Sequence, residues 1–150
     1  MAYQLTYVML KPGVIQRRLV GEILRRLEDK GLELRGMKLM RIAREPAEEH
    51  YGEHRGKAFY DDLISYITSG PVLAMVIGGE EAIGRVRLLA GATRVDEALP
   101  GTIRGDFAAV TTKNIIHASD SPESAQREIG LFFLESEILE YEDPNGPWTV

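Results

Sequence analysis

One histidine of this 150-residue chain lies where its ring could act as a nucleophile toward an anion. The segment from Asn114 to Pro122 runs from two isoleucines into His117 and then into small, hydroxyl-bearing and acidic residues. Ser121 followed by Pro122 is typical of a helix start, because serine caps the first turn and proline fits the first helical position. The histidine is therefore expected to face solvent near a helix N-terminus, which favours anions. We take His117 as the candidate catalytic nucleophile.

A phosphoryl group is one anion that a histidine nitrogen can accept, because neutral imidazole is nucleophilic near neutral pH. Two other ways of handling phosphate are excluded by the sequence. P-loop chemistry needs a glycine-rich loop ending in Lys-Ser or Lys-Thr, and the sequence has no such segment. Protein kinases need a glycine-rich flap and separate metal ligands in a much longer chain. The covalent route remains, and it requires cations for the phosphoryl oxygens and a group that orients the ring.

Composition predicts one compact domain over residues 1–150, because 44% hydrophobic content suffices for a buried core. The formal net charge of −5 argues against a general nucleic-acid binder, so local positive charge must hold any anionic ligand. Cysteine is absent, which excludes disulfides and thiolate metal sites. The sequence shows no signal peptide and no run of membrane-spanning length, so we expect a cytoplasmic protein without a membrane partner.

Hydrophobic patterning predicts the elements that must position these side chains. Strands are expected at residues 3–10, 31–43, 72–77 and 115–116, with a bulge near Gly36 and with Gly78-Gly79 closing the third strand. Helices are expected at residues 19–30, 47–54, 59–68, 80–90 and 122–133, the second opened by Pro46 and paired with the third as a hairpin. We expect a long functional loop at residues 92–105, a return to the core at residues 107–110 and an irregular tail at residues 135–150.

The order of these elements resembles a doubled βαβ unit. It predicts an α+β fold of the ferredoxin-like βαββαβ type, in which helices pack on a four-stranded antiparallel sheet. Such a fold hosts many functions, so the function has to be argued from the site.

Seven stretches match one enzyme family in order along the chain. They are Leu10 to Pro12, Leu19 to Ile23, His50-Tyr51, Ser69 to Val72, Gly91 to Thr93, Pro100 to Phe107 and Asn114 to Ser121. The chain therefore resembles a nucleoside diphosphate kinase from position 5 to about position 141. The segments around His117 and from Pro100 to Phe107 are the most specific.

The resemblance implies a ping-pong exchange through a phosphohistidine. His117 would take the γ-phosphoryl group of ATP or another nucleoside triphosphate and pass it to a nucleoside diphosphate. Mg²⁺ would bridge the nucleotide phosphates, and no side chain is expected to be its ligand. Glu128, two helical turns beyond Ser121, would reach the imidazole and orient it, and Ser119 would hold Glu128 in turn. Tyr51 would donate a phenolic hydrogen bond near His117.

The same resemblance assigns the nucleotide-binding residues. Arg87, Arg104 and the Thr93 hydroxyl would bind phosphate oxygens, since cations offset the charge of the transferred group. Lys11 and Asn114 would lie on the ribose hydroxyls and the phosphoryl path. A further pair, Phe59 and Leu63, would hold the base. Stacking tolerates any base, so we expect broad base specificity.

The resemblance also implies a homo-oligomer, with a hexamer favoured over a tetramer and the loop at residues 92–105 near subunit contacts. No specific nucleic-acid partner is expected. Ala118 is the clearest departure from the family pattern, which more often has glycine, and alanine costs little unless its φ is positive. The segment from Gly146 to Val150 has no counterpart, and Trp148 is either a subunit contact or a surface residue.

Three other interpretations compete with this one. The segment from His50 to His54 fits the H-x-x-E-H pattern of zinc peptidases, but Gly52 weakens the required helix and a solvated helix surface explains the segment better. A non-catalytic nucleotide-binding module would keep the pocket without turnover. His117 as a satisfied structural histidine would not need so many anion-binding residues elsewhere.

Overall fold

The computed structural model describes residues 2–149 and contains one four-stranded antiparallel sheet among them. The strands are β1 (Tyr3–Leu10), β2 (Glu33–Met40), β3 (Val72–Glu80) and β4 (Ile116–Ala118), and their order across the sheet is β2-β3-β1-β4. This arrangement confirms the predicted ferredoxin-like α+β fold. The two central strands, β1 and β3, pair along their whole lengths from Tyr3 opposite Glu80 to Leu10 opposite Leu73.

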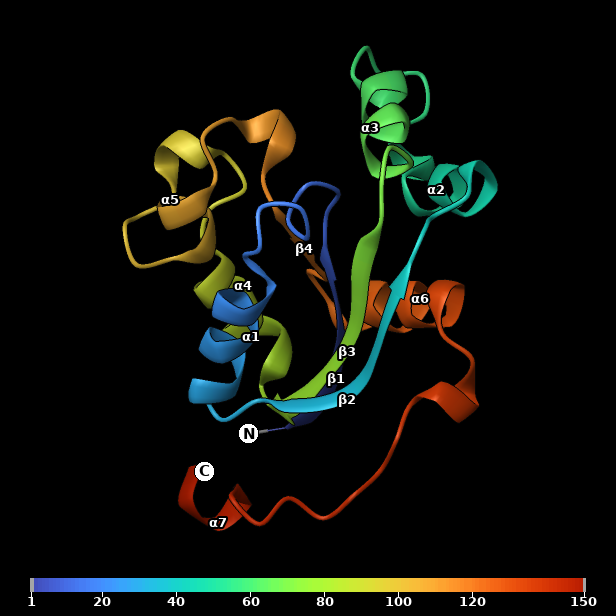
Figure 1. Ribbon diagram of the computed structural model, residues 1–150. Helices are drawn as coiled ribbons and strands as arrows, with labels where there is room; N and C mark the ends of the chain where they lie inside the picture. The colour runs from blue at the N-terminus through green and yellow to red at the C-terminus, as the bar shows by residue number, and fades with distance from the viewer. Residues whose placement is uncertain (1, 150) are drawn as a thin grey trace.

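Helices cover both faces of the sheet (Figure 1). One face carries α1 (Val20–Asp29) and α4 (Ala82–Ala90), and the other carries α2 (Arg44–His50), α3 (Tyr60–Ile67) and α6 (Pro122–Phe132). The shorter helical segments are η1 (Gly52–His54), η2 (Val95–Glu97), α5 (Ile103–Phe107), η3 (Thr111–Lys113), η4 (Glu135–Glu137) and α7 (Gly146–Thr149). Within residues 2–149, no helix combines the length and the apolar character that a bilayer crossing needs.

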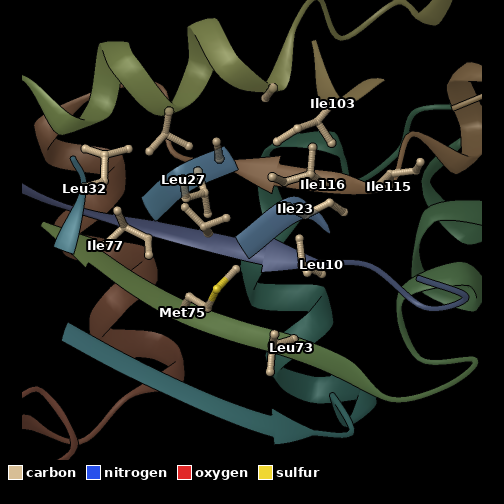
Figure 2. Close-up of a cluster of buried hydrophobic side chains, with 14 of the residues drawn as sticks. Leu10, Ile23, Leu27, Leu32, Leu73, Met75, Ile77, Ile103, Ile115 and Ile116 are labelled. Atoms are coloured by element: carbon tan, nitrogen blue, oxygen red, sulfur yellow. The ribbon is translucent and has the colours of Figure 1, made fainter. Parts of the chain in front are cut away.

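Alternation along the central strands separates the core into two layers. Val8 and Leu10 of β1 point to the layer under α1 and α4, shown in Figure 2, while Tyr7 and Met9 point to the layer under α2, α3 and α6. Such alternation is the two-residue period of a strand. The second layer includes Phe132 of α6, and its Tyr7 ring lies 6.0 Å from the ring of His117 on β4, so this layer can support residues on those two elements.

The expected bulge in β2 is confirmed, since the pairing of β2 with β3 shifts register between Leu34 and Gly36. Other boundaries were wrong. The third strand does not close at Gly78-Gly79 but continues to Glu80, with Gly78 paired between Leu5 and Glu33. A Cβ on Gly78 would press on the Leu5 and Arg35 side chains. Glycine at this position therefore permits close packing and does not mark a turn.

The helix expected from residue 47 begins three residues earlier, at Arg44. Pro46 lies inside its first turn, where the missing N–H is not needed. The helix ends at His50, and the chain continues through Tyr51 into η1. The histidines of the H-x-x-E-H pattern therefore do not share a helix, and this removes the geometry that the zinc-peptidase interpretation requires.

The segment expected as an unpatterned loop at residues 92–105 contains η2 and the start of α5. Thr102 caps α5, since its hydroxyl accepts a hydrogen bond of 3.0 Å from the Gly105 N–H. The predicted return to the core at residues 107–110 is only partly right, because Phe107 packs against the core whereas Val110 is exposed. Helix α5 has five residues, which are too few for helical periodicity to show in the sequence.

The tail beyond α6 is largely irregular, as expected, apart from η4 and α7. It lies against β2, where Leu139 donates its N–H to the Arg35 carbonyl at 2.8 Å and the Tyr141 hydroxyl donates to the Leu34 carbonyl at 2.6 Å. Trp148 is 87% exposed, so within a single chain it is a surface residue. Val150 lies outside the described residues.

Two glycine-to-alanine changes should have opposite effects on stability. A Cβ on Gly105 would collide with the Leu99 backbone carbonyl and the Thr102 hydroxyl, so Gly105→Ala should lower the free energy of unfolding by about 2 kcal/mol or more. Gly84, inside α4, has nothing within 4 Å of its Cβ position, so Gly84→Ala should raise it by up to about 1 kcal/mol. Urea denaturation of both variants measures these effects. Equal stability of the two variants would contradict the packing described for α5.

Candidate active site

The His117 ring is held from one side by a carboxylate. Its Nε2 lies 2.7 Å from Oε1 of Glu128, and the Ser119 hydroxyl donates to the same oxygen at 2.7 Å. The His117 side chain is 21% exposed and the Glu128 side chain 6%, so the histidine is less open to solvent than its sequence context predicted. The sequence also placed it after the strand, whereas it lies within β4, opposite Met9 of β1.

The hydrogen bond to Glu128 defines the chemical state of the ring. A carboxylate only accepts hydrogen bonds, so Nε2 carries a proton, and in the neutral ring Nδ1 then has the lone pair. Burial pushes the pKa of Glu128 upward, but the hydrogen bonds from His117 and Ser119 and the charge of His117 outweigh it and hold that pKa below its ordinary value. Glu128 is therefore ionised at neutral pH and can stabilise positive charge on the imidazole.

The backbone just before His117 is strained. Ile115 has a φ of 75°, which is unfavourable for a β-branched residue, and the Ile116 N–H donates to the Asn114 carbonyl at 2.8 Å. A positive φ spanned by a hydrogen bond between residues two apart describes a γ-turn of the rare, strained type. Ala118, the position that the sequence marked for inspection, has no positive φ and pairs with Val8. The strain therefore lies three residues earlier than the sequence suggested.

Arg104 fixes this turn from α5. Its guanidinium donates to the carbonyls of Gly91, Asn114 and Ile116 at 2.8, 3.3 and 2.6 Å. The side chain is buried, and burial together with the charge of Arg87 lowers the pKa of Arg104 to about 10, so it stays charged at neutral pH. A guanidinium has five N–H groups. Two of them remain for a ligand after the three carbonyl contacts.

Lys11 and Asn114 meet at the end of β1. The Lys11 Nζ donates to Oδ1 of Asn114 at 2.7 Å, and the Asn114 amide donates to the Thr93 carbonyl at 3.4 Å. Burial lowers the pKa of Lys11 to about 7, and the charge of Arg104 contributes in the same direction. The buried ammonium has no carboxylate partner among residues 2–149, so an anionic ligand would stabilise its charged form.

Arg87 and Thr93 complete the set of residues expected to bind phosphate. Arg87 lies on the exposed side of α4 and donates to the Ala118 carbonyl at 3.1 Å, while the Thr93 side chain is exposed just beyond the same helix. Neither Arg87 nor Arg104 takes part in an ion pair within the described residues. Positive charge without acidic partners therefore gathers beside His117 in a chain with a net charge of −5.

The region of Tyr51 differs from the expectation. Its buried ring packs against His50 at a centroid distance of 4.5 Å, and within residues 2–149 no hydrogen bond joins its hydroxyl to His117. Burial raises the pKa of Tyr51, so the hydroxyl keeps its proton. His50 was wrongly placed on a solvated surface: it is 4% exposed, and its ring stands edge-on to that of His117 at 4.7 Å. The charged residues around His50 concealed its burial.

Phe59 and Leu63 form an apolar shelf at the start of α3. Phe59 is 46% exposed, and the Leu63 N–H donates to its carbonyl, which places the two residues one helical turn apart. The His54 ring lies 5.3 Å from the Phe59 ring, and the Lys57 ammonium lies 5.7 Å from its centroid. An exposed aromatic face flanked by polar groups suits a planar ligand.

The chain matches known proteins of one family over most of its length. The family model described as nucleoside diphosphate kinase matches residues 4–138. A nucleoside diphosphate kinase of Treponema pallidum is 59% identical over 145 residues, covering 97% of each chain, and one of Archaeoglobus fulgidus is 57% identical over 143 residues, covering 95% of each. The structure of a halophilic nucleoside diphosphate kinase from Halobacterium salinarum in complex with CDP has a TM-score of 0.96 and 47% identity, covering 99% of each chain.

Replacing Glu128 with glutamine should destabilise the protein in a pH-dependent way. Loss of a buried, charge-assisted hydrogen bond costs about 1.5–3 kcal/mol at pH 7. Because the folded-state pKa of Glu128 is lowered, its contribution is present above the unfolded-state pKa of about 4.3 and is lost as pH falls through the folded-state value. Urea denaturation at pH 7 and pH 3.5 should show the difference from wild type shrinking in acid. A difference that does not depend on pH would contradict an ionised Glu128.

Proposed function

The chain belongs to the nucleoside diphosphate kinase family, and we propose that its own His117 carries the phosphoryl group between nucleotides. The observation that carries this proposal is the bond between His117 Nε2 and Glu128, which leaves Nδ1 with a lone pair beside several unpaired cations. In the first half-reaction Nδ1 attacks the γ-phosphorus of a nucleoside triphosphate, the bond to the bridging oxygen breaks, and the diphosphate leaves. In the second, a terminal oxygen of another diphosphate attacks the phosphohistidine, and the electron pair returns to Nδ1.

Glu128 and Ser119 support the ring through both steps. The imidazole becomes positive as its nitrogen bonds to phosphorus, and the adjacent carboxylate offsets that charge. Glu128 also keeps the proton on Nε2, and the Ser119 hydroxyl fixes the carboxylate oxygen that accepts it. Tyr51, buried beside His50, is the remaining residue assigned here, with its phenolic O–H as a donor to the substrate or to the phosphoryl group.

The cations bind the phosphates. Lys11, Arg87 and Arg104 stabilise the negative charge that spreads over the transferred group, and the Thr93 hydroxyl adds a neutral donor. Asn114, already bonded to Lys11, orients the ammonium and contacts the ribose hydroxyls. This arrangement lets an acidic protein bind a polyanion without a basic surface.

The residues present fit a divalent ion that arrives with the nucleotide. Mg²⁺ prefers oxygen ligands, chiefly carboxylates and phosphates. The Glu128 carboxylate already contacts the side chains of His117, Ser119 and Arg127, so the nucleotide phosphates would be the ligands of Mg²⁺. When bound, Mg²⁺ would neutralise phosphate charge, and Lys11, Arg87 and Arg104 would position the same oxygens.

The base is held by stacking on Phe59 with Leu63 beside it. The CDP-bound relative from Halobacterium salinarum supports a nucleoside diphosphate as ligand. Stacking does not depend on the hydrogen-bonding edge of the base, so ATP and other nucleoside triphosphates and diphosphates serve as substrates with little base preference.

Assembly and location follow from the same proposal. We assign residues 1–150 to a single domain and expect a cytoplasmic homo-oligomer, a hexamer in preference to a tetramer. Support for the oligomer comes from β2, an edge strand on which Met37 and Leu39 are exposed, because exposed apolar residues on a sheet edge favour pairing with another chain. The acidic net charge argues against a specific nucleic-acid partner.

Replacing His117 with alanine should abolish the covalent intermediate. Wild-type protein incubated with Mg²⁺ and γ-labelled ATP should gain one acid-labile phosphoryl group per chain and transfer it to added GDP or CDP. The His117→Ala variant should show neither step, with transfer reduced by at least about 10⁴-fold. His54→Ala, a change at a partly exposed histidine of η1, is the matched control and should be labelled normally.

This experiment also separates a phosphoryl-transfer enzyme from a non-catalytic nucleotide-binding module. A non-catalytic nucleotide-binding module would bind ATP without labelling in the wild type. Labelling that persists in His117→Ala would place the nucleophile elsewhere.

Nucleotide binding should take up a proton at mildly alkaline pH through Lys11. With a pKa of about 7 in the free protein, Lys11 is mostly neutral at pH 8, and a bound diphosphate raises that pKa by opposite charge. Calorimetric titration with Mg-ADP in buffers of different ionisation enthalpy should show uptake of close to about one proton per chain at pH 8 and little at pH 6. Lys11→Arg, which is always charged, should bind without this uptake. Equal uptake by wild type and Lys11→Arg would assign the proton to another group.

A further inference from the structure

Metal-binding side chains cluster around His117, whose Nε2 faces Glu128. His50, His117 and Glu128 each offer one donor atom, and these three atoms all lie within 4.8 Å of one another. They come from α2, β4 and α6, which the second core layer holds together. Two imidazoles and one carboxylate are a donor set found at catalytic zinc sites, where water or substrate takes the fourth position.

His50 has no role in the proposed phosphoryl transfer, and its environment is unusual. Its side chain is buried, and its Nδ1 has no hydrogen-bond partner within the described chain. A buried nitrogen without a partner is costly and calls for an explanation. Neutral imidazole binds metals through a ring nitrogen.

We infer that His50, His117 and Glu128 form a binding site for a borderline-soft divalent cation such as Zn²⁺, separate from the Mg²⁺ that accompanies the nucleotide. Imidazole nitrogen suits Zn²⁺, whereas Mg²⁺ prefers oxygen and keeps to the phosphates. The Glu128 carboxylate supplies the negative charge that such an ion needs.

The geometry requires a small adjustment. Zn–N bonds of about 2.1 Å in a tetrahedral site place neighbouring donors about 3.4 Å apart. The bond of 2.7 Å between His117 and Glu128 must therefore open, and donors separated by up to 4.8 Å must close. Rotations of the side chains supply such movements without a change in the backbone. His117 is the most exposed of the three side chains, so the ion enters past its ring.

Coordination at Nε2 has a direct consequence for the nucleophile. Neutral imidazole carries one proton, which now lies on Nε2. When the metal takes the Nε2 lone pair, that proton moves to Nδ1 through solvent, and no proton is gained or lost overall. Nδ1 then has no lone pair with which to attack phosphorus. This inhibitory consequence rests on the proposed phosphoryl transfer, whereas the metal site itself does not.

Direct metal binding tests the site without any turnover. Tag-free wild-type protein, titrated with Zn²⁺ against a chromophoric chelator in the absence of nucleotide, should bind one ion per chain. Co²⁺ should give the visible absorption of a tetrahedral site. His50→Phe keeps a ring of similar shape without a donor and should weaken Zn²⁺ binding by about tenfold or more. His54→Phe is the matched control outside the cluster and should bind like wild type.

The outcomes are decisive for the site. Absence of Zn²⁺ binding by folded wild-type protein would overturn the inference, as would equal affinity of His50→Phe and wild type. Should His50→Phe fail to fold, judged by circular dichroism, His50→Asn replaces it with the same expectation.

Inhibition is measured separately as the fraction of phosphoryl transfer lost when Zn²⁺ is added at constant, excess Mg-ATP. Wild type and His54→Phe should lose the same fraction, and His50→Phe should need about tenfold more Zn²⁺. Equal inhibition of His50→Phe would mean that Zn²⁺ acts by replacing Mg²⁺ on the nucleotide, and the inhibitory role would be rejected. Absence of transfer in wild type before Zn²⁺ is added would refute the proposed function and leave the metal site standing on its binding data.

Discussion

The candidate site depends on one buried guanidinium bonded to backbone carbonyls. Arg104 joins the end of α4, at Gly91, to both sides of the strained turn at Ile115. Carbonyl dipoles satisfy three of its N–H groups without cancelling its charge, as a carboxylate would. The same side chain therefore holds an unfavourable backbone conformation in place and leaves a full positive charge next to His117. Backbone strain of this kind persists only where the surroundings over-determine it.

The cations of the candidate site lie apart from carboxylates. Lys11 remains buried although burial disfavours its charged form, and its partner is the amide of Asn114. Among the described residues, the carboxylate of Glu128 lies beside the imidazole and not beside these cations. Burial of a cation without a carboxylate partner lowers the stability of the free protein, and a bound anion restores it. The binding energy therefore depends on the charge of the ligand. The acidic remainder of the surface has no part in this balance.

Much of the fold could be predicted because its signals are local. Strand alternation, helical periodicity, the bulge at Gly36 and the Ser121-Pro122 helix start all appear within short windows of sequence. The five-residue helix α5 gave no periodic signal. Burial of His50 could not be predicted either, since charged neighbours surround it in sequence while Tyr7, His117 and Phe132 surround it in space. The positive φ of Ile115 depends on Arg104, ten residues away in sequence from Asn114, and an isoleucine pair by itself favours an ordinary strand.

The short strand β4 ties the site to the order in which the chain is made. Lys11 and Asn114 are 103 positions apart, and Tyr7 and Ser119, which share a hydrogen bond, are 112 apart. α6, which carries Glu128, comes later still. During synthesis, the residues up to α6 must leave the ribosome before the nucleophile, its cations and its carboxylate can meet. A chain that stops between β4 and α6 therefore carries His117 without the carboxylate that orients it.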